Sequence, residues 1–191
     1  MLETIKEGFE ESIIVKRKII KDDALIAAIA QAASKLIESY KKGGKLIIFG
    51  NGGSAADAQH ISTELQHQFA VKRRRALPAI SLSTNTSTLT AIGNDWGFAE
   101  VFSRQVEGLA TDKDMVIGIT TSGNSENVIL GIQQAKKQGA FTIALTGKDG
   151  GKIRSIADLS IIVPSTDTAR IQESHITIGH ILCTIVEKES I

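Results

Sequence analysis

Cysteine is nearly absent from this chain of 191 residues: Cys183 is the single one, so no disulfide can form within the chain. Structural disulfides belong to oxidising compartments, so their absence is typical of a reducing one. The chain also lacks an apolar leader after Met1 and any apolar run long enough to cross a membrane. We therefore expect a cytoplasmic protein in which Cys183, placed in an apolar helical pattern, is a buried structural thiol.

An excess of charge of one sign is also missing. Lys and Arg number 22 against 21 Asp and Glu, which gives a formal net charge of +1. Such a balance offers no general electrostatic attraction for nucleic acid or an anionic membrane, so neither is expected as a partner. The one dense basic run is KRRR at residues 72–75. We interpret it as a solvated loop, with a patch for a phosphate or an acidic partner as the alternative.

Aromatic residues make up only 4% of the chain, so its core must come from Ile, Leu, Val and Ala. Short apolar runs alternate with helical patterns, and Pro78 and Pro164 lie at strand borders, where a missing donor is tolerated. Strands are expected at residues 45–49, 79–83, 115–121, 140–145 and 159–163, and helices at about 54–69, 86–92, 100–109, 125–138 and 168–188. This alternation predicts a three-layer α/β/α sandwich around a five-stranded parallel sheet.

The first forty residues have a helical pattern throughout. Apolar residues recur at helical spacing after Asp22 or Asp23, either of which could cap a helix, and Gly43 and Gly44 end the pattern. We expect one domain over residues 1–191, with a helical extension at 1–43 and an α/β core at 44–191. No linker divides the chain.

Small polar residues follow three of the expected strands, at residues 51–54, 120–125 and 146–151. In an open parallel sheet, ligands bind at the carboxyl ends of the strands. The second loop, TTSGNS, also opens a helix, whose free N–H groups and hydroxyls suit a phosphate. Turn and capping chemistry alone is the alternative. Neither a P-loop ending nor a complete dinucleotide-binding fingerprint is present.

His60 and Glu64 are four residues apart on the helix that follows the first glycine loop, so both project from one face. Such a pair can bind a divalent metal, and a carboxylate in a cleft can act as a base. His67 roughly shares that face. A surface pair without function is the alternative. On the last helix, Gln172 and His180 lie loosely on one side, and the alternative there is an apolar helix with a few satisfied polar groups.

Five motifs, taken together, are specific. Residues 50–60 (GNGGSAADAQH), 91–95 (AIGND), 121–125 (TSGNS), 145–151 (LTGKDGG) and 169–173 (ARIQE) resemble the phosphoheptose isomerases of the sugar isomerase (SIS) fold. The resemblance covers nearly the whole chain and is weakest in the first forty residues. It implies a flavodoxin-like SIS fold and conversion of sedoheptulose 7-phosphate to D-glycero-D-manno-heptose 7-phosphate. That reaction is the first step towards nucleotide-activated heptoses for lipopolysaccharide or capsule.

The resemblance also implies the roles of individual residues. Glu64 and His180 are expected to be catalytic, and a zinc ion is expected at His60, Glu64, Gln172 and His180. Substrate binding is expected at Asn51, Gly52, Gly53, Ser54, Glu64, Asn94, Asp95, Thr120, Thr121, Ser122, Ser125 and Gln172. A homotetramer with shared active sites is implied as well.

Helix geometry gives a separate reason to expect a shared site. Gln172 and His180 are eight residues apart, or about 12 Å along a helix, whereas two ligands of one ion lie about 3–3.5 Å apart. One helix could manage this only with both side chains leaning fully inward. A contribution from a neighbouring subunit would relieve that strain.

One position departs from the family pattern. Members commonly have Glu-Leu-x-x-Arg, whereas residues 64–68 are ELQHQ, so Gln68 replaces the arginine. If that arginine binds substrate anions, affinity or substrate preference would change here, and the basic run at 72–75 could compensate. Two other functions are the alternatives. A non-catalytic SIS module that binds a replication initiator or another partner would have no need of His60, Glu64, Gln172 and His180 together. A sugar-phosphate-sensing regulator would need an added DNA-binding domain.

Overall fold

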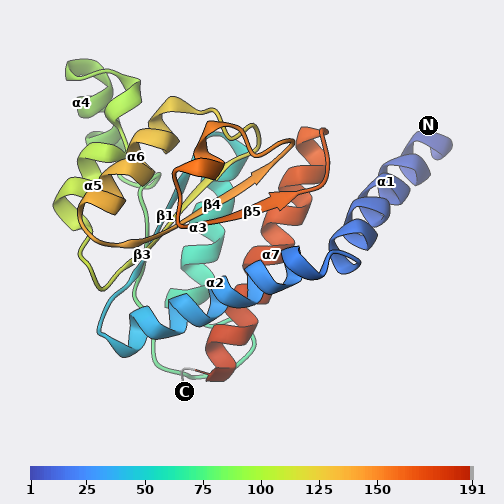
Figure 1. Cartoon of the computed structure of the whole chain (residues 1–191), viewed down its shortest axis with the longest axis horizontal. Helices are drawn as coiled ribbons and strands as arrows, with labels where there is room; N and C mark the ends of the chain where they lie inside the picture. The colour runs from blue at the N-terminus through green and yellow to red at the C-terminus, as the bar shows by residue number, and fades with distance from the viewer. Residues whose placement is uncertain (190–191) are drawn as a thin grey trace.

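The computed structural model describes residues 1–189, so the last two positions of the expected core at 44–191 lie outside the described residues. Five parallel strands form one sheet in the order β2-β1-β3-β4-β5. They are β1 (Leu46–Gly50), β2 (Ala79–Ser81), β3 (Met115–Thr120), β4 (Phe141–Gly147) and β5 (Leu159–Val163). Helices cover both faces of this sheet (Figure 1). The predicted three-layer sandwich with a flavodoxin-like strand order is confirmed.

Alternation along the strands divides the core into two halves. Leu46 and Ile48 belong to a cluster packed under α1 (Leu2–Ile20), α2 (Asp23–Lys41), α3 (Gly53–Gln66) and α7 (Thr168–Glu189). Ile47 and Phe49 point the other way, towards α5 (Ser103–Leu109), α6 (Glu126–Lys137) and the 3-10 helix η2 (Lys152–Ser155). Beside these lie α4 (Thr86–Asp95) and the 3-10 helix η1 (Phe98–Glu100). Because the strands are apolar on both sides, the sheet is buried between two helical layers.

Two predicted boundaries are wrong for reasons of local hydrogen bonding. The second strand was expected to run to residue 83, but β2 ends at Ser81. There Ser81 accepts hydrogen bonds from the Ser83 N–H and the Thr84 hydroxyl, and these form a turn. The helix expected to reach residue 69 ends at Gln66, because the backbone N–H of Phe69 donates to the distant Glu187 carboxylate instead of continuing the helix.

The first forty residues form two helices that meet at residues 21 and 22. The Asp22 carboxylate accepts a hydrogen bond from the Leu25 N–H, as expected of an N-cap. Leu36 and other apolar residues of α2 are buried in the core. In contrast, α1 projects from the body of the molecule (Figure 1) and leaves Leu2, Ile5 and Phe9 exposed. No helix of residues 1–189 is both long enough and apolar enough to span a bilayer.

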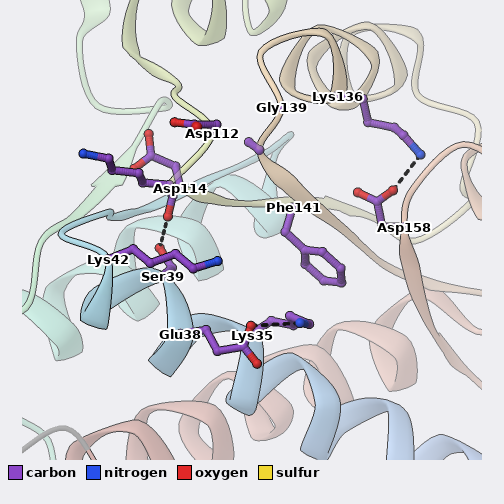
Figure 2. A pocket seen from close by; sticks show the side chains of 12 residues that line it. Lys35, Glu38, Ser39, Lys42, Asp112, Asp114, Lys136, Gly139, Phe141 and Asp158 are labelled. Carbon is purple, nitrogen blue, oxygen red and sulfur yellow. Dashed lines mark hydrogen bonds and ion pairs between the residues drawn. The ribbon is translucent and has the colours of Figure 1, made fainter.

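A hollow of about 430 Å³ lies at the amino ends of β3 and β4, where α2 meets the loops before these strands. Its charged residues largely neutralise one another. Figure 2 shows Lys136 paired with Asp158 and Lys35 paired with Glu38. The nitrogen–oxygen distances of these ion pairs are 2.7 and 2.8 Å. The buried Asp114 carboxylate accepts from the Lys45 ammonium at 2.7 Å. This hollow is at the opposite edge of the sheet from the loops expected to bind ligand.

Candidate active site at the carboxyl ends of β1 and β3

The chain leaves β1 and β3 towards opposite faces of the sheet, into α3 and α6 respectively. Because these strands are neighbours, their carboxyl ends form a topological switch point, where ligands bind in open α/β sheets. Two side-chain amides connect the two loops. Asn51 and Asn127 each donate to the other's carbonyl oxygen, both at 2.9 Å. The Asn51 amide is therefore held in place from the opposite helical layer.

The loop after β3 places hydroxyls around the start of α6. The Thr120 and Ser125 hydroxyl oxygens are 3.0 Å apart, and the Ser122 hydroxyl accepts from the Asn124 N–H. Ser125 is the N-cap residue of α6, but its side chain accepts no hydrogen bond from the first-turn N–H groups that the structure describes. The first-turn N–H groups of α6 are thus open to an anion, and the hydroxyls lie beside them.

The loop after β1 brings α3 close to α7. Gly52 has φ 55°, a backbone conformation that favours glycine, and α3 begins at the next residue. A Cβ on Gly53 would lie 2.6 Å from the Gln172 side-chain nitrogen. Gln172 therefore rests against the N-terminus of α3, and a larger residue than glycine at position 53 would displace it.

From that contact α3 and α7 run side by side in the same direction. Gly53 meets Gln172, and seven residues further along α3 the His60 Nε2 lies 3.2 Å from the His180 Nε2. Gly179 makes the close approach possible, because a Cβ there would lie 2.5 Å from Ile61 Cδ1. The two histidines thus meet about 12 Å along α7 from Gln172, because eight residues of a helix span that distance.

Three of the expected functional side chains come together here. His60 Nε2 is 3.2 Å from Glu64 Oε1 as well as 3.2 Å from His180 Nε2. The His60 side chain is 47% exposed and the Glu64 side chain 22%, so both can be reached by a ligand. A carboxylate and two imidazoles at one accessible point are suited to proton transfer.

The donors of this cluster are of the kinds that zinc binds in proteins. Bonds of about 2.0–2.2 Å in a tetrahedron place ligand atoms about 3.3–3.6 Å apart, close to both separations that involve His60. Within residues 1–189, however, no group of three or more His, Cys, Asp or Glu side chains is already assembled as a metal site. The side chain of Gln172, on α7, rests against Gly53 at the start of α3, about two helical turns before His60. His60, Glu64 and His180 supply donors whose chemistry fits zinc, whereas Gln172 lies apart from them within one chain.

The other two histidines and two of the expected substrate contacts lie elsewhere. His67 is exposed at the end of α3, outside the cluster around His60. His175 is fully buried, with Nε2 3.1 Å from the Thr146 carbonyl oxygen, and burial lowers its pKa to about 4. Asn94 and Asp95 end the exposed helix α4, where the Asn94 amide donates to the Asp95 carboxylate. No hydrogen bond or ion pair of the described chain joins these two residues to the other expected site residues.

The interpretation of residues 72–75 as a solvated loop is wrong for one of its four members. The Arg74 and Glu187 side chains are both 0% exposed and form an ion pair at 2.6 Å. Arg74 Nη2 also donates to the Glu64 carbonyl oxygen at 2.7 Å. Arg74 is therefore not free to replace the family arginine in binding substrate anions. Gln68, which occupies that position, accepts from the Arg73 N–H.

Two more residues next to His60 and His180 were not predicted from the sequence. The Phe69 ring stacks on His180, with centroids 4.9 Å apart and planes at 22°. Asp57 precedes His60 by one helical turn. Burial raises its pKa, nearby His60 opposes that shift, and its Oδ2 has no hydrogen-bond partner among the described residues. The spacing of three residues before His60 was the available signal for Asp57, whereas nothing local pointed to Phe69.

A parallel sheet with hydroxyl-lined loops at its switch point is the architecture of the SIS domain, and the SIS domain family matches residues 7–147. Sequence relatives narrow the assignment. The chain is 54% identical over 188 residues to the phosphoheptose isomerase of Aquifex aeolicus, covering 98% of this chain and 97% of that one. It is 53% identical over 189 residues to that of Geobacter sp. strain M21, covering 99% and 97%.

Solved structures of phosphoheptose isomerases have the same fold as this chain. Phosphoheptose isomerase GmhA from Neisseria gonorrhoeae superposes with a TM-score of 0.91 at 42% identity, covering 98% of both chains. A phosphoheptose isomerase from Francisella tularensis gives 0.93 at 39% identity, with the same coverage. The chain belongs to the phosphoheptose isomerase family. A more distant match, the sugar isomerase domain of an RpiR transcription factor from Sphaerobacter thermophilus, has 17% identity and shows the shared fold alone.

Proposed function

We propose that this chain converts sedoheptulose 7-phosphate to D-glycero-D-manno-heptose 7-phosphate, as an aldose–ketose isomerase. The observation that carries the proposal is the meeting of Glu64, His60 and His180 at one accessible point on α3 and α7. Relatives named phosphoheptose isomerase, with more than 50% sequence identity, support it. A non-catalytic, partner-binding role is not favoured, because these relatives are isomerases and the acid–base groups are present.

The chemistry moves one proton between two carbons. The ketose must lose a proton from C1, pass through an enediol and gain a proton at C2, while a second proton moves between the two oxygens. We assign the carbon proton to the Glu64 carboxylate and the oxygen protons to the His180 imidazole. General acid–base groups of this kind contribute about 10²–10⁴-fold to rate. Stacking on Phe69 and contact with His60 hold the imidazole of His180 in place.

The phosphate end does no chemistry and fixes the sugar chain. We propose that the first-turn N–H groups of α6 and the hydroxyls of Thr120, Ser122 and Ser125 hold it. The open helix start and the adjacent hydroxyls support this role. Binding there keeps the reacting carbons near the acid–base cluster, which lowers the entropic part of the barrier. The remaining expected substrate contacts, at residues 51–54, 64, 94, 95, 121 and 172, are proposed from family membership.

We propose zinc as the cofactor, held by His60, Glu64 and His180, with Gln172 as a further ligand on the ground of family membership alone. The nitrogen and oxygen donors support this choice, and the two separations of 3.2 Å suit ligands of one ion. When bound, such an ion would polarise the sugar oxygens between which a proton moves.

We propose that the active form is a homotetramer whose subunits share active sites. An apolar hollow of about 300 Å³ among α1, α2 and α7 supports association between chains, as do the exposed Leu2, Ile5 and Phe9 of α1. Mixing two inactive variants, Glu64→Gln and His180→Ala, after dissociation should restore part of the activity if sites are shared. A fully active monomer in light scattering would exclude the tetramer.

We further propose that the reaction takes place in the cytoplasm, where sugar phosphates are made, and begins the synthesis of nucleotide-activated heptose. The function is tested by incubating purified protein with sedoheptulose 7-phosphate and following the aldose product by NMR. Appearance of D-glycero-D-manno-heptose 7-phosphate is expected. No product, with or without added zinc, would exclude the proposed function.

A further inference from the structure

The Glu187 carboxylate is a buried junction between α7 and the loop that follows α3. It accepts hydrogen bonds from the backbone N–H groups of Phe69, Ala70 and Val71 at 2.6, 2.6 and 2.9 Å, and from Arg74 Nε at 2.6 Å. Burial alone would raise the pKa of Glu187, but these four donors outweigh it and lower the pKa to about 2. Glu187 is thus an anion with every strong acceptor direction in use.

Arg74 carries the connection on to α3. Its guanidinium donates through Nε to Glu187, through Nη2 to the Glu64 carbonyl oxygen at 2.7 Å and through Nη1 to the Arg75 carbonyl oxygen at 2.8 Å. Glu64 lies in the last turn of α3, where carbonyl oxygens have no partner within the helix. A fixed cation at that end also matches the negative pole of the helix. Arg74 therefore fixes the backbone of the residue assigned as the base.

The other end of the junction leads to His180. Glu187 is seven residues after His180, two turns further along the same face of α7. The hydrogen bond from the Phe69 N–H to Glu187 holds the loop in the position in which the Phe69 ring stacks on His180. In Figure 1 the segment after α3 passes beside the C-terminal end of α7, where these bonds form. Both proton-transfer residues are thus connected to one buried ion pair.

We infer that Arg74 and Glu187 are positioning residues for the isomerisation: their buried ion pair fixes the backbone of Glu64 relative to the imidazole of His180. This inference rests on the proposed function. It gives the basic run at residues 72–75 a definite role. Arg74 aligns Glu64 with His180 through the backbone of α3 and makes no contact with substrate. Neither residue faces the loops after β1 and β3, so the phosphate end of the site is independent of the pair.

Two variants test the inference. Glu187→Gln keeps the size of the side chain but turns one acceptor into a donor that faces N–H groups, and Arg74→Lys keeps the charge but loses the planar fork. Each should lower kcat about 10–100-fold, because a misplacement near 1 Å can cost about 10²-fold. KM should stay within about threefold, because the phosphate contacts are untouched. A substrate deuterated at C1 should show an isotope effect on kcat at least as large as in wild type, since proton transfer is the step impaired.

Asp114→Asn is the matched control. Asp114 is also a buried carboxylate with four donors, from the backbone and side chain of both Lys45 and Thr111, but none of these hydrogen bonds reaches α3, α7 or the loop between α3 and β2. Urea unfolding measures the stability of each variant. Asp114→Asn should lose stability as Glu187→Gln does, yet keep its kcat.

Three results would overturn the inference: a kcat within about twofold of wild type in both variants, an equal loss of kcat in the control, or a rise in KM alone. If wild type itself does not turn over, the proposed function fails on its own, and crystal structures of wild type and Arg74→Lys then decide the inference. They should show the Glu64 backbone displaced relative to His180. Unchanged positions of these two residues would overturn it.

Discussion

Gly179 offers the sharpest test of how α3 and α7 hold the acid–base cluster. It precedes His180 and faces Ile61, which follows His60 on the neighbouring helix. In Gly179→Ala the new Cβ would lie 2.5 Å from Ile61 Cδ1 and 2.7 Å from Ile61 Cγ1. Carbon atoms pack best at about 3.5–4.0 Å. The two helices must therefore separate by roughly 1 Å, or Ile61 must leave its rotamer.

The expected stability change combines two opposing contributions. Replacing glycine by alanine inside a helix stabilises it by about 1 kcal/mol. Overpacking a buried contact costs about 1–3 kcal/mol. The net effect should be a destabilisation of about 0–2 kcal/mol. Because a 1 Å displacement of catalytic groups can cost about 10²-fold, kcat should fall by roughly one to two orders of magnitude.

Urea unfolding and steady-state kinetics measure both effects. Gly108→Ala is the control, since a Cβ at the exposed Gly108 of α5 meets no atom of the described chain within 4 Å. It should keep its kcat and lose no stability. Ile61→Ala removes both clashing atoms, so the free energies of the single and double variants should be non-additive by about 0.5–3 kcal/mol in favour of the double variant. Additive free energies, or an unchanged kcat in Gly179→Ala, would refute the close-packing argument.

Three further predictions concern the substrate, the metal and pH. Ser122→Ala combined with Ser125→Ala should mainly raise KM for the sugar phosphate, and a fall in kcat at unchanged KM would exclude phosphate binding there. Purified protein should contain a divalent metal by elemental analysis, lost on changing His60 or His180, and full activity of a metal-free, chelated preparation would contradict this. The pKa of Glu187 falls, despite burial, from 4.5 to about 2 through its hydrogen bonds. The folded state therefore binds fewer protons, and the stability from Glu187, complete above pH 4.5, is lost as pH falls towards 2. Glu187→Gln should lose less unfolding free energy than wild type in that window, and an equal loss would contradict the assignment.

The regular part of the fold could be predicted from sequence because its causes are local. Apolar runs such as residues 46–50 indicate strands that are buried on both faces, and Asp22 has the side chain of an N-cap. The placement of His60 and Glu64 on one face follows from helical spacing alone. These features depend on neighbours within a few residues.

What could not be predicted depends on distant partners. The local pattern around Arg74 is that of an exposed basic loop, and only the arrival of Glu187, 113 residues later, makes it a buried ion pair. The same partner ends α3 early by accepting the Phe69 N–H. Likewise the amide pair of Asn51 and Asn127 joins residues 76 apart. Contacts between separate elements carry no periodic signal in the chain.

The central claim is that Glu64 transfers the carbon proton of a heptose phosphate, and its most direct test compares wild type with Glu64→Gln. Both proteins are given sedoheptulose 7-phosphate, product formation is followed by NMR, and urea unfolding confirms that the variant is folded. Wild type should form D-glycero-D-manno-heptose 7-phosphate, and Glu64→Gln should lose about 10²–10⁴-fold in turnover. A folded Glu64→Gln protein that keeps more than about a tenth of wild-type turnover would contradict the account.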